Sequence, residues 1–319
     1  MVEWSDALLK RNEDYVSVDM GGQSFPFFEV GLDIVNRSET GPLSFRVFTD
    51  QHSYEYETVF TGDGVIYRAL QHDLQINFGK KRSLRLSAFF QNEPPIFYFD
   101  SGGFLIYNRY CELNLSNRQP FDPDRIEAWD WSGTDIVVES QTQQKLQTSI
   151  QYRLIQTVLS PSWDVAYDFI LDDDAANEAA DVVGIKVEAE EILIHLFHCK
   201  FSSKPTPGAR VEDFYEVCGQ AQRSARWRHD TEKLLHNLLL RNAKRLTSSG
   251  VTRFEKGTND VLVSIKNRCR LLKPRLSIFI VQPGLSKSKV TANLLELLAT
   301  TEMHVRDTSH AELRVIASR

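Results

Sequence analysis

Short stretches of alternating polar and apolar residues characterise the first third of the chain. Five runs between about residues 14 and 120 are rich in β-branched and aromatic residues, and turn-forming glycines and prolines separate them. No apolar stripe with helical spacing and useful length occurs in this region. The pattern therefore predicts a small antiparallel β domain, with strands at residues 15–18, 43–48, 74–78, 84–87 and 96–99.

The pattern changes near residue 143. Apolar residues recur every four positions from Leu146 to Val158, which predicts an amphipathic helix over residues 144–159 that Pro161 brings to an end. Three strands are expected next, followed by two helices, a strand, a helix and a final strand, at residues 165–171, 181–187, 192–200, 211–228, 231–245, 276–282, 290–303 and 313–317. This order of elements predicts an α/β sandwich with a central mixed sheet.

Residues 120–142 have the composition of a linker. Prolines at 120 and 123 and Gly133 interrupt any regular period. Trp129 and Trp131 are expected to act as packing anchors between domains, and a base-stacking role is the alternative. The chain is therefore predicted to be an α+β protein with a β-rich N-terminal domain and linker over 1–142 and a second domain over 143–319.

Length and composition narrow the class of protein. A chain of 319 residues is long enough for two domains, and 42% apolar with 25% charged residues is typical of a globular protein. No apolar run is long enough to span a membrane, and the N-terminal residues lack the features of a signal peptide. The four cysteines have neither zinc-site spacing nor the density of a disulfide scaffold. We expect a reduced, cytoplasmic protein with no membrane partner.

The charge distribution is more informative than the net charge of −6. Residues 200–275 contain 17 Lys and Arg against 7 Asp and Glu, a local charge of +10, so the remainder carries −16. A strongly basic segment in an acidic protein favours binding to nucleic acid, although an ordinary solvated helix face is the alternative. The cations expected to contact phosphates are Arg223, Arg226, Arg228, Lys233, Arg241, Lys244 and Arg245.

Candidate chemistry lies where two of the predicted strands meet. Asp181 opens the strand at 181–187, and Lys200 closes the strand at 192–200, with His198 two residues earlier. Because side chains alternate between faces, His198 and Lys200 point the same way, and a hairpin would bring Asp181 close to both. A carboxylate that holds a divalent cation, together with a lysine that stabilises charge on a phosphate, suits phosphodiester hydrolysis.

These residues and several segments around them resemble the PD-(D/E)XK nuclease superfamily. Residues 145–319 are similar to the nuclease-type C-terminal domain of bacterial superfamily-2 helicases, which is often encoded near phage-defence genes. The matching segments are Asp172–Asp174, Asn177–Asp181, Phe197–Ser202, Gly208–Val211, Tyr215–Gln222, Val281–Ser286 and Leu313–Ser318. The resemblance implies a restriction-endonuclease-like fold for the second domain and a metal-dependent deoxyribonuclease active in anti-phage defence.

The resemblance also implies roles for individual residues. Asp181, His198 and Glu178 are the expected metal ligands for Mg²⁺ or Mn²⁺, and Lys200 is the motif lysine. Gln220 is the expected helix glutamine at the active site, and Gln222 is expected to contact DNA. His198 departs from the superfamily pattern of Asp or Glu, and imidazole suits Mn²⁺ better than Mg²⁺. Glu178 or one of Asp172–Asp174 is then expected to supply the missing oxygen, unless the site is weak or inactive.

The resemblance implies DNA as a partner, together with a helicase or other ATPase partner or a fused helicase region. The chain has no phosphate-binding loop of the Walker type, so the motor is expected on a separate subunit, or this chain is the C-terminal piece of a longer helicase. The alternative is a catalytically degenerate nuclease-fold module that binds DNA or docks to a helicase, and a third reading is a structural adaptor. Each site residue also has a structural interpretation: Asp181 as a strand start, His198 as a hydrogen-bonded core histidine and Lys200 as a lysine that reaches solvent.

Overall fold

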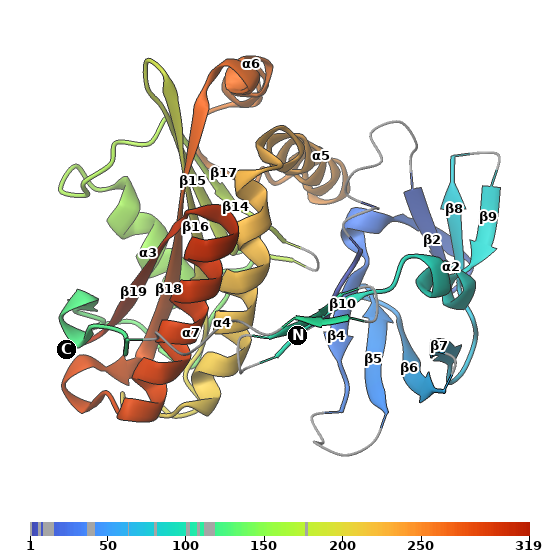
Figure 1. The fold of residues 1–319 in the computed structure, drawn as a ribbon. Helices are drawn as coiled ribbons and strands as arrows, with labels where there is room; N and C mark the ends of the chain where they lie inside the picture. The colour runs from blue at the N-terminus through green and yellow to red at the C-terminus, as the bar shows by residue number, and fades with distance from the viewer. Residues whose placement is uncertain are drawn as a thin grey trace. The chain divides into compact units, whose positions relative to one another are not determined.

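The protein forms two compact units, Met1–Leu113 and Asn114–Arg319 (Figure 1). The structure, a computed structural model, describes residues 2–5, 8, 16–36, 42–62, 64–79, 82–99, 103–106, 109–111, 119–175 and 178–319. The division therefore falls earlier in the chain than the boundary expected at residue 142. The α+β class and the antiparallel β-structure of the N-terminal region agree with the sequence-based prediction.

The described part of the first unit contains three antiparallel sheets of four strands each. The first has the order β1 (Val2–Glu3), β10 (Ile96–Tyr98), β11 (Phe104–Ile106) and β12 (Arg109–Cys111). The second has the order β3 (Gln23–Pro26), β2 (Val16–Met20), β8 (Gln75–Phe78) and β9 (Arg82–Arg85). The third has the order β4 (Gly31–Ile34), β5 (Leu43–Phe48), β6 (Ser53–Thr61) and β7 (Gly64–Ala69).

Aromatic rings form the core of this unit. The Phe45 ring lies 5.4 Å from Phe90 and 5.7 Å from Phe97 between centroids, and Trp4 stacks on Phe90 at 5.6 Å. Phe90 belongs to helix α2 (Leu86–Asn92), where the sequence predicts a strand at 84–87. Leu86, Phe89 and Phe90 have the spacing of one helical face, and their burial favours the helix over the strand. Tyr15, the first residue of the strand expected at 15–18, lies outside the described residues.

The second unit is built on a seven-stranded mixed sheet. Its order is β13 (Ile126–Trp129), β19 (Glu312–Ser318), β18 (Lys273–Ser286), β16 (Glu191–Cys199), β15 (Val182–Val187), β14 (Phe169–Asp172) and β17 (Phe254–Lys256). The four strands from β13 to β16 run parallel, and the pairs from β16 to β17 are antiparallel. The central mixed sheet predicted from the sequence is confirmed.

Helices cover both faces of this sheet. Helices α4 (Glu212–Ser224) and α7 (Ala292–Ser309) lie side by side over one face (Figure 1). Helix α3 (Ile150–Leu159) packs on the other face against a core that includes Phe197 and Phe279. Helices α5 (Thr231–Ser249) and α6 (Asn259–Arg268) contribute side chains to the same core as α4 and α7. Short 3₁₀ turns occur at Phe27–Glu29, Pro123–Arg125, Ala225–Arg228, Cys269–Leu271 and Lys287–Lys289.

The passage expected to be a linker contributes to the sheet instead. Strand β13 pairs in parallel with β19, and the Trp131 Nε1 donates a hydrogen bond of 3.1 Å to the Ala317 carbonyl. The Trp129 ring stacks on Trp131 at 5.7 Å and meets Trp163 edge-on. The two tryptophans therefore pack within the second unit, which corrects their expected role as anchors between domains.

Two further observations concern the cysteines and the helices. All four cysteines are free, and Cys199, Cys218 and Cys269 are buried. Across the described ranges, no helix combines the length and the apolar character needed to cross a membrane.

Candidate metal centre

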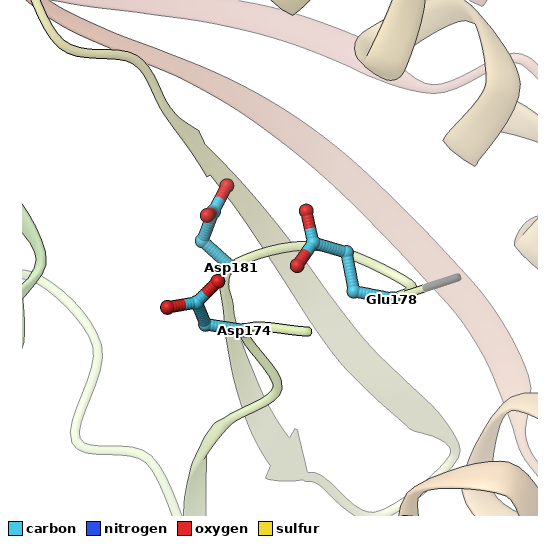
Figure 2. A group of neighbouring side chains, drawn as sticks. All are labelled: Asp174, Glu178 and Asp181. Atoms are coloured by element: carbon cyan, nitrogen blue, oxygen red, sulfur yellow. The ribbon is translucent and has the colours of Figure 1, made fainter. Parts of the chain in front are cut away.

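Three carboxyl groups come together on the connection between β14 and β15. Asp174, Glu178 and Asp181 each offer an oxygen, and these oxygens lie within 4.8 Å of one another. Figure 2 shows the three side chains grouped on this connection. Because β14 and β15 pair antiparallel, with Asp172 opposite Val182, the chain returns within a few residues and brings both ends of the connection together. Asn177 lies outside the described residues.

Asp181 is the most firmly held member of this acidic group. Its Oδ1 accepts a hydrogen bond of 3.0 Å from Gln151 Nε2, and its Oδ2 accepts one of 2.9 Å from the Cys199 backbone N–H. The side chain is buried. The contact with Cys199 follows from the antiparallel pairing of β15 with β16, which sets Val182 opposite Phe197. Strands β15 and β16 do form the hairpin that the sequence-based hypothesis required, and it brings Asp181 to the end of β16.

A second set of polar contacts supports the acidic group from the segment before α3. Gln151 Oε1 accepts a hydrogen bond of 2.9 Å from the Gln141 backbone N–H. The Gln141 side chain in turn donates 3.1 Å to Asp172 Oδ2. The Ser140 hydroxyl donates to Asp174. These bonds fix the orientation of two of the three carboxyl groups, so the acidic group is built by hydrogen bonding as well as by chain topology.

Of the acidic run Asp172–Asp174, the third residue alone joins the group. Asp173 pairs with Arg241, and Asp172 Oδ2 lies 2.9 Å from Arg245 Nη1. Both arginines are buried in α5, with 5% and 7% of their side chains exposed. The sequence offers Glu178 or one member of this run as the missing oxygen ligand. The structure brings both Glu178 and Asp174 to Asp181.

Burial and the negative charges of neighbouring carboxylates shift the pKa values within the acidic group. Burial raises the pKa of Glu178 to about 8, and the charge of Asp174 adds to this shift while Arg223 opposes it. Burial also raises the pKa of Asp181 well above its usual value, and the charge of Glu178 acts in the same direction. The group therefore retains protons near neutral pH, and a bound cation would offset the same repulsion.

Lys200 follows β16 and lies in a second, mixed-charge cluster. Its Nζ lies 2.8 Å from Glu216 Oε1 on α4 and 3.5 Å from Glu139 Oε2. Burial alone would lower the pKa of Lys200, but the charges of Glu139 and Glu216 outweigh it and raise the pKa. The lysine is thus held as a cation. Its charge also interacts with Asp181, which links this cluster to the acidic group.

His198 occupies a different environment from the one expected of a metal ligand. Its Nε2 lies 2.8 Å from the Ser224 hydroxyl on α4, and that hydroxyl donates 2.8 Å to the Ala179 carbonyl. Because the single hydroxyl proton goes to Ala179, His198 Nε2 carries the proton that bonds to Ser224. Burial lowers the pKa of His198 to about 3, so the ring is neutral. The acidic group found among the described residues does not include it, and its contacts match the core-histidine interpretation.

The two glutamines expected near the site lie on α4 and differ from each other. Gln222 is buried, with 4% of its surface exposed. Gln220 is half-buried, and its Oε1 has no hydrogen-bond partner among the described residues. No hydrogen bond joins either side chain to the acidic group within the described ranges, whereas Arg223, the next residue on this helix, does reach it.

The basic residues chosen from the sequence do not form one surface. Arg223 Nη2 donates 2.8 Å to the Glu178 carbonyl, which places it beside the acidic group. The Arg226 guanidinium lies over the Trp227 ring at 4.9 Å, and Arg228 donates 3.2 Å to the Ser309 carbonyl. Lys233 lies 3.8 Å from Asp230. Lys244 is exposed. The phosphate-contact role expected of Arg241 and Arg245 is corrected, because these two are buried and paired with aspartates.

Three residues at the site were not singled out from the sequence. Gln151 carried a usable signal, since it is a polar residue one turn before Ile155 on the buried face of α3. Glu139 follows an irregular segment with no period, and Glu216 lies on an exposed helix position. Their proximity to Lys200 depends on tertiary packing, which no local pattern reports.

Comparisons with known proteins add no relative: no protein-family model, curated protein or solved structure matches this chain. The resemblance to the PD-(D/E)XK superfamily therefore stays a prediction.

Proposed function

We propose that this protein is a divalent-metal-dependent nuclease that cleaves DNA phosphodiester bonds. The observation that carries the proposal is the meeting of Asp174, Glu178 and Asp181 within 4.8 Å, on a strand connection that adjoins the end of β16. Lys200 follows that strand directly. An acidic cluster is common on protein surfaces, but here it is hydrogen-bonded into place and accompanied by the half-buried Lys200.

The donor set fits a hard divalent cation. All three groups are carboxylates, and Mg²⁺ and Mn²⁺ prefer such oxygen ligands and retain several water molecules. Burial raises the pKa values of Glu178 and Asp181, and repulsion between the carboxylates, which a cation would relieve, adds to the rise. The soft or borderline ligand expected from the sequence, His198, is not among the donors. We therefore propose Mg²⁺ or Mn²⁺ as the cofactor.

Different residues of this chain would serve different roles in hydrolysis. A cation bound by the acidic group would polarise the scissile phosphate and lower the pKa of the attacking water. Gln151 and the Cys199 backbone N–H hold the Asp181 carboxylate in one orientation. Lys200 stabilises negative charge that develops on the phosphate, and Glu139 and Glu216 keep it protonated for this role.

The DNA substrate is supported by charge and by the sequence resemblance. Arg223 lies beside the acidic group and offers a guanidinium to an adjacent phosphate. The proposed helicase partner and the role in anti-phage defence rest on the resemblance of residues 145–319 alone.

A second candidate function is a degenerate nuclease-fold module that binds DNA or a helicase without cleaving DNA. The observation that favours it is the position of His198, which bonds to Ser224 where the superfamily pattern expects a carboxylate ligand. Loss of one ligand would weaken cation binding unless Asp174 replaces it.

The test is cleavage of labelled single- and double-stranded DNA with Mg²⁺, Mn²⁺ or EDTA. We expect metal-dependent cleavage that is lost in Asp181→Asn and in Lys200→Ala. Asp260→Asn and Lys289→Ala make the same chemical changes at exposed positions, so they should cleave like the wild type. Salt-sensitive DNA binding without cleavage in either metal would establish the binding module instead. Cleavage that persists in EDTA would overturn the metal assignment.

A further inference from the structure

Two exposed aromatic residues adjoin Lys200 and its partner Glu216 in the chain. Phe201 follows it directly along the chain and is 43% exposed. Tyr215, on α4, is 42% exposed and adjoins Glu216, the carboxylate that holds the lysine. Single exposed apolar side chains are common on protein surfaces, so the exposure of these rings matters here through their closeness in the chain to Lys200 and to its partner Glu216.

Hydrogen bonds hold the two aromatic residues on neighbouring segments. The Gln282 side-chain amide donates 3.1 Å to the Phe201 carbonyl and 3.2 Å to the Asp213 carbonyl, two residues before Tyr215. The Ser203 backbone N–H donates 3.3 Å to the Asp213 carboxylate. The segment after β16 is therefore tied to the first turn of α4. The backbone that carries each ring is fixed, while the rings themselves remain accessible.

The charges around these rings are mixed, since Lys200 lies beside Phe201 while Asp213 and Glu216 lie on either side of Tyr215 in α4. The Lys200 Nζ lies 4.8 Å from the centre of the Phe201 ring, in a cation–π contact. Lys204, three residues after Phe201, is exposed. Arg223 lies two turns beyond Glu216 on α4 and reaches the acidic group. Aromatic faces interleaved with cations are the arrangement that binds unpaired nucleotides.

We propose that Phe201 and Tyr215 stack on unpaired bases next to the bond to be cleaved, so the preferred substrate is single-stranded DNA. This inference rests on the proposed function for its position in the reaction, and it names the substrate class of the same site. Bases in a duplex already stack on one another, so an exposed ring gains most from bases that are unpaired. Stacking tolerates any base, which predicts little sequence preference.

Binding measured in EDTA tests this inference without any cleavage. The probes are a fluorescein-labelled single-stranded oligonucleotide, the matching duplex, and a single strand that carries 2-aminopurine, whose fluorescence falls when it stacks. We expect the wild type to bind the single strand at least about fivefold more tightly than the duplex and to quench 2-aminopurine. Phe201→Leu and Tyr215→Leu should each weaken single-strand binding at least about fivefold and reduce the quenching.

Three controls separate stacking from other causes. Phe201→Trp keeps an aromatic face and should keep wild-type binding. Leu271→Ala removes a side chain that is 86% exposed, just before the first residues of β18, and should change nothing. Because both aromatic residues are exposed, the leucine variants should unfold at the wild-type temperature.

The outcomes also separate this inference from the proposed function. Equal affinity for single strand and duplex, no binding to either, or wild-type binding by both leucine variants would overturn the stacking proposal. Quenching that depends on the two rings would support it, even if the wild type cleaves no DNA with Mg²⁺ or Mn²⁺. That last result would overturn the nuclease and leave a single-strand-binding surface.

Discussion

At the scale of single residues, the acidic group shows how a few hydrogen bonds decide which carboxylates are available to a ligand. Asp172 and Asp173 are neutralised by buried arginines, and their neighbour Asp174 faces Glu178 and Asp181 instead. Three carboxyl groups this close together repel one another, and protons or a divalent ion relieve the repulsion that Arg223 does not offset. Both proton binding and metal binding at the acidic group should therefore change the stability of the folded protein, which can be measured.

Glu178 gives a prediction about pH. Its pKa of about 8 in the folded protein exceeds its usual value of 4.5, so the folded state binds more protons than the unfolded state between these values. In EDTA, the free energy of unfolding should therefore fall as pH rises from about 5 to 8. Glu178→Gln should flatten this dependence, and Glu188→Gln, an exposed control, should not. Thermal unfolding at several pH values measures it, and a profile unchanged by Glu178→Gln would contradict the assignment.

Mg²⁺ or Mn²⁺ at pH 8 should raise the unfolding temperature of the wild type, because the cation binds the folded state alone. Glu178→Gln should reduce this rise, since it replaces one of three carboxylate ligands with a neutral amide. The Glu188→Gln control should show the same rise in unfolding temperature as the wild type. If neither ion shifts the unfolding temperature of the wild type, the acidic group is not a metal site.

His198 gives a prediction that separates its two interpretations. As a neutral core histidine bonded to Ser224, it contributes to stability and not to metal binding. His198→Leu should lower the free energy of unfolding by about 1–3 kcal/mol, because Ser224 loses a buried partner. The rise in unfolding temperature with Mn²⁺ should remain. Loss of that rise in a variant that still folds would restore His198 as a ligand.

At the scale of elements, the β15–β16 hairpin positions most of the site. Alternation along β16 sends His198 and Leu196 toward α4, and Phe197 and Cys199 toward α3. Helix α5, which carries four cations of the basic segment, joins the connection between β14 and β15 through ion pairs. Its role toward the acidic group is therefore structural.

The Arg241–Asp173 ion pair provides the test at this scale. Removing one partner of a buried pair leaves the other charge unpaired, so Arg241→Met should destabilise the protein by about 3–5 kcal/mol. Lys244→Met changes an exposed residue of the same helix and should cost less than about 0.5 kcal/mol. Urea unfolding measures both. Unchanged stability in Arg241→Met, with weaker DNA binding, would return Arg241 to the phosphate-contact role.

The sequence predicts elements well where a local pattern determines them. Strand β5 matches the expected residues 43–48, and β15 and β16 match within one residue at each end of the predicted strands, because each shows a strong apolar run. Strands β13 and β17 are four and three residues long, and their pairing partners are distant in sequence. Helix α6 was not predicted, because its two buried residues, Leu262 and Ile265, form too short an apolar stripe to indicate a helix. The acidic group was partly foreseen through Asp181 and Glu178, whereas Glu139 required tertiary contacts.

At the scale of the whole molecule, every residue assigned to the site belongs to the second unit. The acidic group, Gln151, Lys200 and both exposed aromatic residues lie within Asn114–Arg319. That unit has its own seven-stranded sheet and cores on both faces. The local charge of +10 over residues 200–275 lies in this unit as well. Metal binding and DNA binding are therefore expected of one part of the chain.

Residues 114–319 produced alone should consequently fold and bind metal. We expect one cooperative thermal transition, because both cores of the unit pack on the same sheet and its length is typical of a single domain. Mg²⁺ or Mn²⁺ should raise its unfolding temperature by as much as in the full chain, and Asp181→Asn should abolish the rise in both. Calorimetry of the two proteins side by side measures this. A fragment that folds cooperatively yet shows no metal-dependent rise, when the full chain does, would mean that residues 1–113 contribute to the site.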